Sequence, residues 1–206
     1  MKRASTAAVA ALVLGLGLAA PAQAQYRQIR PGTVSLGLGG SFGLVTGNSR
    51  FGLDFDSGGG YLFALNYAVT PNISLGLNFQ NQTYNWVDGE PRYDNLVVTT
   101  FEGHARLYRK RGTDASQYVL AGIGVYRPEF RIGDTETVFP GEGFLFTGGA
   151  GVELFLRENW ALDLSARGIG YVGNGISDQE FETVEDTGNL SFGLHGQLAI
   201  VYFILK

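Results

Sequence analysis

Residues 191–206 read SFGLHGQLAIVYFILK and alternate between two kinds of side chain. One parity is apolar or neutral throughout, namely Phe192, Leu194, Gly196, Leu198, Ile200, Tyr202 and Ile204. The other parity begins with Ser191, Gly193, His195 and Gln197 and becomes apolar only at Ala199. Because successive strand residues point to opposite faces, this stretch predicts a strand with one apolar and one partly polar face, long enough to cross a membrane.

The first 24 residues have the parts of a secretory signal. Lys2 and Arg3 give a basic start, an apolar stretch runs from about Ala7 to Ala20, and Ala22–Ala24 is a small-x-small cleavage pattern. The apolar stretch is shorter than the roughly 20 residues of a spanning helix, which disfavours a retained anchor. We therefore expect residues 1–24 to be removed on export and residues 25–206 to form one domain.

Composition narrows the class of fold. The 206 residues include 31 glycines, one methionine and no cysteine. An exported chain without disulfides depends on backbone pairing and packing, and frequent glycine suits pleated strands, where it makes room for bulky neighbours. The formal net charge of −4 gives no indication of nucleic-acid binding.

Apolar alternation recurs as eight long stretches in four similar hairpins, which start near Thr33, Ile73, Gln117 and Trp160. Repetition on this scale predicts an all-β fold, an eight-stranded antiparallel up-and-down barrel. Tight turns at 70–72 and 157–159 alternate with longer loops at about 46–60, 85–95, 127–143 and 172–189. Transmembrane β-barrels of the bacterial outer membrane show this asymmetry, with short periplasmic turns and long outer loops.

Together these features resemble the small eight-stranded outer-membrane barrels of the OmpA/OmpX type. The resemblance is carried by the export signal, the alternating strands, glycine-rich segments such as Val34–Gly40, and the strand at the end of the chain. It implies a monomer in the bacterial outer membrane after export to the periplasm, surrounded by outer-membrane lipids and lipopolysaccharide and inserted by the barrel assembly machinery. That machinery usually reads a terminal aromatic residue, whereas Phe203 is the last aromatic here, three residues before the end.

The charged and histidine side chains within the predicted strands fall on the polar parity. They are Glu102, His104, Arg106, Glu153, Asp163, Arg167 and His195. In a membrane barrel this parity points inward, where charges must pair to offset the loss of water. We predict a structural ion-pair plug in which Glu102 or Glu153 contacts Arg106 or Arg167. If the pairs exchange, the same network would gate a narrow polar conduit.

Catalysis is another function that these residue types allow. Ser165, Asp163 and a histidine would supply a nucleophile, an orienting acid and a base, as in barrels that modify the acyl chains of lipid A. All of them would face inward, away from acyl chains in the membrane, so we expect no enzyme. Two histidines without cysteine give no zinc site, and no cofactor or metal is predicted.

The predicted outer loops hold most of the 19 acidic residues. The densest group, in the last loop, is Asp178, Glu180, Glu182, Glu185 and Asp186. A run of like charges is usually a solvated surface. These carboxylates are also candidates for recruiting divalent cations that bridge the loops to anionic lipid headgroups.

Three functions stay open on these patterns. A structural barrel that presents acidic loops is favoured, and a small-solute channel of the OmpW type is its first rival. A soluble periplasmic lipocalin-like barrel would instead turn the apolar row inward around a ligand. Loop asymmetry favours the membrane, as do aromatic residues near strand ends, namely Tyr61, Trp160, Tyr171 and Tyr202. In a membrane orientation Leu198 faces lipid and Gln197 faces the interior.

Overall fold

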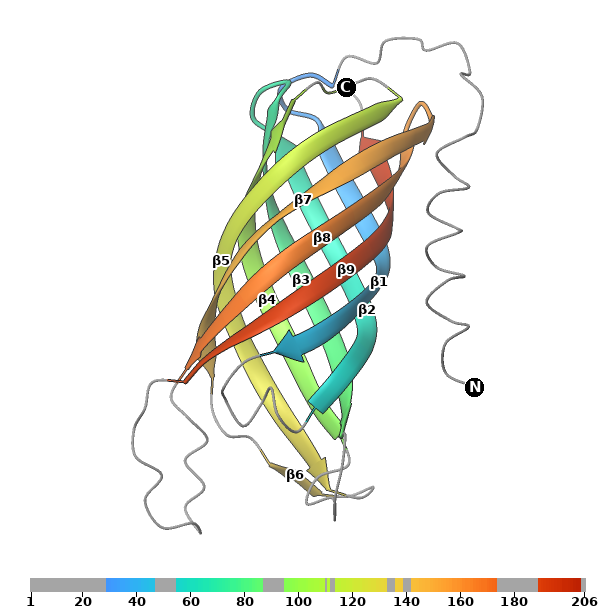
Figure 1. Ribbon diagram of the computed structural model, residues 1–206. Helices are drawn as coiled ribbons and strands as arrows, with labels where there is room; N and C mark the ends of the chain where they lie inside the picture. Colours follow the sequence, from blue (N-terminus) through green and yellow to red (C-terminus); the bar gives the residue numbers. More distant parts are fainter. Residues whose placement is uncertain are drawn as a thin grey trace.

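The computed structural model describes residues 29–46, 55–86, 95–109, 111, 114–132, 136–138, 142–173 and 189–204. Its strands are β1 (Val34–Thr46), β2 (Phe55–Ala68), β3 (Ile73–Trp86), β4 (Asn95–Tyr108), β5 (Ala115–Ile132), β6 (Glu136–Val138), β7 (Gly143–Arg157), β8 (Trp160–Gly173) and β9 (Asn189–Ile204). Antiparallel neighbours follow the order β4-β3-β2-β1-β9-β8-β7-β5, and β4 also pairs with β5, which closes the sheet. The predicted barrel is confirmed, with β6 added beside β5 (Figure 1).

Alternation along each strand gives the barrel two different surfaces. The outward side chains of Leu38, Ile123 and Phe144 are 66%, 74% and 72% exposed. In β9 the neighbours Gln197 and Leu198 are 7% and 46% exposed, so they lie on opposite faces as predicted. The apolar row therefore faces outward, which contradicts the lipocalin-like alternative.

Short turns connect neighbouring strands at one end of the barrel. Between β2 and β3, the Thr70 hydroxyl accepts hydrogen bonds from the backbone N–H groups of Asn72 at 3.3 Å and Ile73 at 3.0 Å. Between β7 and β8, the carbonyl of Asn159 accepts one from the N–H of Phe203 at 2.8 Å. Both turns lie where the sequence predicts them. We call this the turn end of the barrel and the opposite end the loop end.

An apolar cluster occupies the interior near the turn end. It consists of Ile29, Ala68, Ala161, Val201 and Phe203, with Phe155 packed against it. Gly32, whose φ of 90° favours glycine, donates its N–H to the carbonyl of Ala68 at 2.8 Å. This turn carries Ile29 into the cluster. The predicted signal, residues 1–24, lies outside the described residues. Among the described residues, no helix is long and apolar enough to span a membrane.

Two predicted loops are shorter than expected. β2 begins at Phe55, inside the predicted loop 46–60, and β5 continues to Ile132, inside the predicted loop 127–143, where β6 pairs with it. The prediction was wrong because it followed apolar alternation. Beyond Val125 the outward positions of β5 are polar, while pairing with β4 continues as far as Arg131. Backbone pairing therefore extends the strand past the apolar region.

Interior glycines leave space for large polar side chains. A Cβ atom at Gly43 would lie 3.0 Å from the His195 ring, and one at Gly151 would overlap the Tyr118 ring. This confirms the expected role of glycine beside bulky neighbours.

Aromatic side chains also mark the outer surface at the turn end. Trp160 and Tyr202 point outward with ring centroids 4.8 Å apart. Tyr171, which the sequence analysis counted among such interfacial aromatics, is instead buried and points inward. The reason is its parity, because Tyr171 shares a face of β8 with Arg167.

Candidate functional site

All seven predicted interior residues point into the barrel, and none is more than 5% exposed. Six of them form two ion-paired groups, and the seventh, His195, makes its hydrogen bonds to neutral side chains.

The first group surrounds Arg106 near the turn end. Its guanidinium Nη1 lies 2.6 Å from Oδ2 of Asp163 and 3.4 Å from Oε1 of Glu153. Arg106 is on β4 and Asp163 is on β8, with β5 and β7 between them on the shorter way round. The contact therefore crosses the lumen, and it includes one of the predicted pairs.

Two tyrosines donate hydrogen bonds to these carboxylates. Tyr108 donates its hydroxyl proton to Oε1 of Glu153 at 2.6 Å, and Tyr118 donates to Oδ1 of Asp163 at 2.5 Å. The Arg106 guanidinium also lies 4.6 Å from the centroid of the Tyr118 ring. Such charge-assisted hydrogen bonds are stronger than neutral ones. The sequence analysis missed both tyrosines, although Tyr108 has the same parity as Arg106.

Arg111 is a further residue that the sequence analysis did not place in the interior. It follows β4 in the turn, yet its side chain is only 3% exposed and its Nε lies 3.7 Å from Oε2 of Glu153. Its guanidinium lies 4.0 Å from the centroid of the Tyr108 ring. We call the residues Arg106, Tyr108, Arg111, Tyr118, Glu153 and Asp163 the turn-end cluster.

The second ion-paired group lies one step further from the turn end. Arg167 on β8 contacts Oε1 of Glu102 on β4 at 3.2 Å, which is another predicted pair. His104 places Nδ1 3.5 Å from the same Glu102 oxygen and Nε2 2.9 Å from Oδ1 of Asn66. The buried arginines and carboxylates in ion pairs balance: Arg106, Arg111 and Arg167 match Glu102, Glu153 and Asp163.

His195 lies toward the loop end in a neutral hydrogen-bonded group. The Gln80 amide lies 3.1 Å from Nδ1, while the hydroxyls of Tyr84 and Tyr171 lie 3.1 Å and 3.4 Å from Nε2. An amide nitrogen only donates, so Nδ1 accepts and the proton of a neutral imidazole is on Nε2. We call the residues Gln80, Gln82, Tyr84, Tyr171, His195 and Gln197 the glutamine–tyrosine cluster. The sequence analysis grouped His195 with the charged residues. Its cross-strand neighbour is indeed Arg167, but its hydrogen bonds are to neutral side chains.

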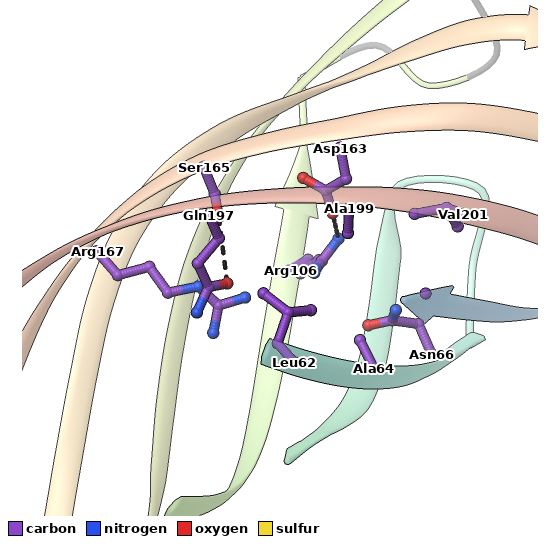
Figure 2. Close-up of a pocket in the computed structure, with 11 residues that line it drawn as sticks. Leu62, Ala64, Asn66, Arg106, Asp163, Ser165, Arg167, Gln197, Ala199 and Val201 are labelled. Atoms are coloured by element: carbon purple, nitrogen blue, oxygen red, sulfur yellow. Dashed lines mark hydrogen bonds and ion pairs between the residues drawn. The ribbon is translucent and has the colours of Figure 1, made fainter. Parts of the chain in front are cut away.

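A small cavity lies between the charged groups and the wall formed by β1, β2 and β9. Figure 2 shows Arg106, Asp163 and Arg167 on one side of it and Leu62 and Ala64 on another. Its volume of about 10 Å³ is close to the least that one water molecule needs.

The residues considered for a catalytic triad do not form the hydrogen bonds of one. Ser165 contacts Gln197 at 3.5 Å and Asp163 contacts Arg106 and Tyr118, and within the described residues neither Ser165 nor Asp163 has a hydrogen bond to a histidine. Within the described residues there is no group of three or more acidic, histidine or cysteine side chains placed to hold a metal ion. The predicted loop carboxylates, Asp178, Glu180, Glu182, Glu185 and Asp186, lie outside the described residues.

Comparisons with known proteins agree with this architecture. The family model described as outer membrane protein beta-barrel domain matches residues 9–195. Three solved structures are similar to the chain. Neisserial surface protein A has 12% identity and a TM-score of 0.62, covering 83% of this chain and 98% of that one. OprG from Pseudomonas aeruginosa has 12% identity and a TM-score of 0.56, covering 88% and 100%.

The third structure is Ail, the attachment invasion locus protein of Yersinia pestis, with 14% identity and a TM-score of 0.51 over 84% of this chain and 99% of that one. At these identities the likeness concerns the fold alone. A comparison with curated protein sequences finds no match.

A closed barrel with an apolar outer surface and a polar interior defines a transmembrane β-barrel. The chain belongs to the outer membrane protein beta-barrel domain family and is a protein of the bacterial outer membrane. Outer-membrane lipids and lipopolysaccharide are therefore its surroundings. In such barrels the short turns face the periplasm and the long loops face the cell exterior.

Proposed function

We propose that this protein is a structural outer-membrane barrel with a plugged polar interior, which presents acidic loops at the cell surface. The observation that carries the proposal is the contact of Arg106 with Asp163 and Glu153 across the lumen. These side chains come from β4, β8 and β7, so they tie together strands that are not all neighbours.

Electrostatics supports the closed state. The interior arginines and carboxylates are equal in number and mutually paired, so an incoming ion would have to replace a short contact already present. The apolar cluster around Phe203 adds a poorly solvating layer at the turn end. Among the described residues, paired interior charges around a cavity of only about 10 Å³ favour a plug over a conduit.

Conductance of the folded protein in planar lipid bilayers tests this proposal. We expect no channel steps from the wild-type barrel. The double variant Arg106→Ala/Asp163→Ala removes the contact that crosses the lumen while keeping the charge balance, and steps from this variant alone would show that the contact helps to close the barrel. Defined steps from the wild-type protein would overturn the plug and favour the OmpW-type channel.

The remaining parts of the proposal concern processing and assembly. We propose that residues 1–24 are a signal removed on export, that residues 25–206 form the mature barrel, and that the protein is a monomer inserted by the barrel assembly machinery. We also propose that it is not an enzyme, which is supported by the hydrogen bonds of Ser165, His104 and His195, because among the described residues none of them joins Ser165 to a histidine. The mass of the mature protein, and its mass when cross-linked in membranes, test the cleavage site and the monomer.

A further inference from the structure

The small cavity beside the charged groups lies between side chains of very different size. Arg106 from β4 and Arg167 from β8 line one part of it, while the wall formed by β1, β2 and β9 contributes Gly37, Ala64 and Ala199 (Figure 2). These small residues leave a space that the arginines do not fill. At about 10 Å³ the cavity admits one molecule of the size of water and nothing much larger.

One hydrogen-bond donor of the cavity wall has no partner. Nη1 of Arg167 lies 3.2 Å and 3.4 Å from the two carboxylate oxygens of Glu102. Nε of the same guanidinium is buried and has no hydrogen-bond partner among the described residues, and Arg167 as a whole is only 1% exposed. Leaving a buried donor unsatisfied is costly, and more so when the donor is charged. An acceptor is therefore needed in the cavity beside Arg167.

Other groups that line the cavity still have the capacity to accept hydrogen bonds. The carboxylate of Asp163 accepts one hydrogen bond at each oxygen, from Arg106 and Tyr118, and a carboxylate offers about four acceptor positions. The Ser165 hydroxyl donates to Gln197 at 3.5 Å, so its oxygen remains free to accept. Ser165 faces inward and is nevertheless only partly buried. The cavity thus combines an unpartnered donor with available acceptors.

We propose that this cavity is a binding site for one structural water molecule, which accepts a hydrogen bond from Nε of Arg167 and donates to Asp163 and Ser165. A buried water typically makes about three hydrogen bonds, to polar groups that are otherwise unsatisfied. Nε of Arg106 lies 3.3 Å from Nε2 of His104, which already connects the two ion-paired groups. The water adds a second connection, from Arg167 to Asp163. This inference goes beyond the proposed plug because it assigns a ligand to the lumen.

Charge balance favours water over a small anion such as chloride. Two guanidinium groups beside a cavity attract an anion, but Arg106 and Arg167 are already paired with Asp163 and Glu102. An anion would therefore bring an uncompensated charge into a buried region, which is costly. Water brings no charge, and it both accepts from the unpartnered donor and donates to the acceptors.

Magnetic cross-relaxation between water and the folded protein in micelles tests the site. In protein with nitrogen-15 arginine, we expect a rotating-frame cross-peak between water and the Nε–H of Arg167, with the sign of a dipolar contact and not of proton exchange. Arg167→Lys removes this N–H and so assigns the signal. Gly37→Ala should abolish the cross-peak, because the new Cβ enters the cavity wall 3.4 Å from Cβ of Ala64 and 3.6 Å from Cγ2 of Val201, which are ordinary contacts. Gly40→Ala is the matched control. It adds the same methyl group on the outward face of β1, 3.6 Å from the nearest backbone oxygen, and should leave the cross-peak unchanged.

Three results would overturn the proposal: no cross-peak in the wild type, an undiminished cross-peak in Gly37→Ala, or a saturable shift of the Arg167 Nε–H signal when chloride replaces gluconate, which would identify an anion instead. Heat-dependent gel migration establishes that each variant is folded. If Gly37→Ala does not fold, the wild-type cross-peak and the chloride titration decide the question. Failure of the plug is seen separately, as channel steps from the wild-type protein in planar bilayers.

Discussion

Two regions of the same interior solve the problem of buried polarity in different ways. The turn-end cluster uses full charges, with Arg106 contacting two carboxylates across the lumen. The glutamine–tyrosine cluster uses neutral groups, with His195 held between Gln80 and Tyr84. Both regions are buried. Since an unpaired charge is far more costly to bury than an unpaired neutral group, the first region should respond more strongly to the loss of one partner.

The largest effect is expected in the turn-end cluster. Arg106→Met removes the arginine that is ion-paired with Asp163 and leaves Glu153 with Arg111 at 3.7 Å, and breaking a buried ion pair in this way costs about 3–5 kcal/mol. The double variant Arg106→Met/Asp163→Leu leaves Glu153 with Arg111, so its charges balance again, and it should be more stable than the single variant. Urea unfolding in lipid vesicles measures both. Equal midpoints for the single and double variants would contradict the ion-pair plug.

A charge on the outer surface of β9 should be the next most damaging change. Leu198 is half exposed toward lipid, and an arginine near the bilayer midplane costs about 2–4 kcal/mol. Leu198→Arg should therefore sharply reduce folding into vesicles. The lipid chains offer the new guanidinium neither a carboxylate, as in the turn-end cluster, nor an amide or hydroxyl oxygen, as in the glutamine–tyrosine cluster.

Fluorophores at positions 197 and 198 provide an independent check of this orientation. A quencher dissolved in the lipid should reach position 198 and not position 197, because adjacent strand residues point to opposite faces. Quenching at position 197 alone would mean that the assigned faces are reversed.

A matched pair of tyrosine substitutions compares the two clusters directly. Tyr118→Phe removes a hydroxyl that donates to the Asp163 carboxylate, and Tyr84→Phe removes one that donates to the Gln82 amide oxygen at 2.9 Å. The expected losses of stability are about 1.5–3 kcal/mol for the hydrogen bond to a charged group and about 1 kcal/mol for the neutral one. The same unfolding measurement applies. A larger loss for Tyr84→Phe would contradict the distinction between charged and neutral regions.

The sequence predicts which side chains enter the barrel better than it predicts which of them meet. Parity alone places Glu102, Arg106 and Asp163 inside, because the side-chain period of a strand is two residues. The choice of Asp163 as the closest partner of Arg106 depends on the relative stagger of β4 and β8, which are not neighbours. That stagger is a property of the closed barrel as a whole and leaves no local pattern in the chain.

Arg111 and the outer part of β5 show two further limits of sequence reasoning. Arg111 enters the lumen from a turn, where no two-residue period assigns a side chain to either face. The segment from Arg127 to Ile132 is a strand because it pairs with β4 and β6, although its outward residues are polar. Apolar alternation indicates which part of a strand contacts lipid, so it does not identify the part of a strand that continues beyond the lipid.

The smallest expected effect concerns the loops beyond the glutamine–tyrosine cluster. If the carboxylates of Asp178, Glu180, Glu182, Glu185 and Asp186 recruit calcium or magnesium, millimolar divalent ion should stabilise the barrel by about 1 kcal/mol through preferential binding to the folded state. Chelation should remove this gain and neutralising the five residues should abolish it, while Arg106→Met should lower stability equally with and without the ion.

Thermal unfolding in vesicles with and without chelator measures all of these effects on stability. Because β8 ends at Gly173 and β9 begins at Asn189, at the opposite end of the barrel from the turn-end cluster, the two effects should be additive. An unchanged midpoint on adding calcium or magnesium would mean that the loop carboxylates are only a solvated surface.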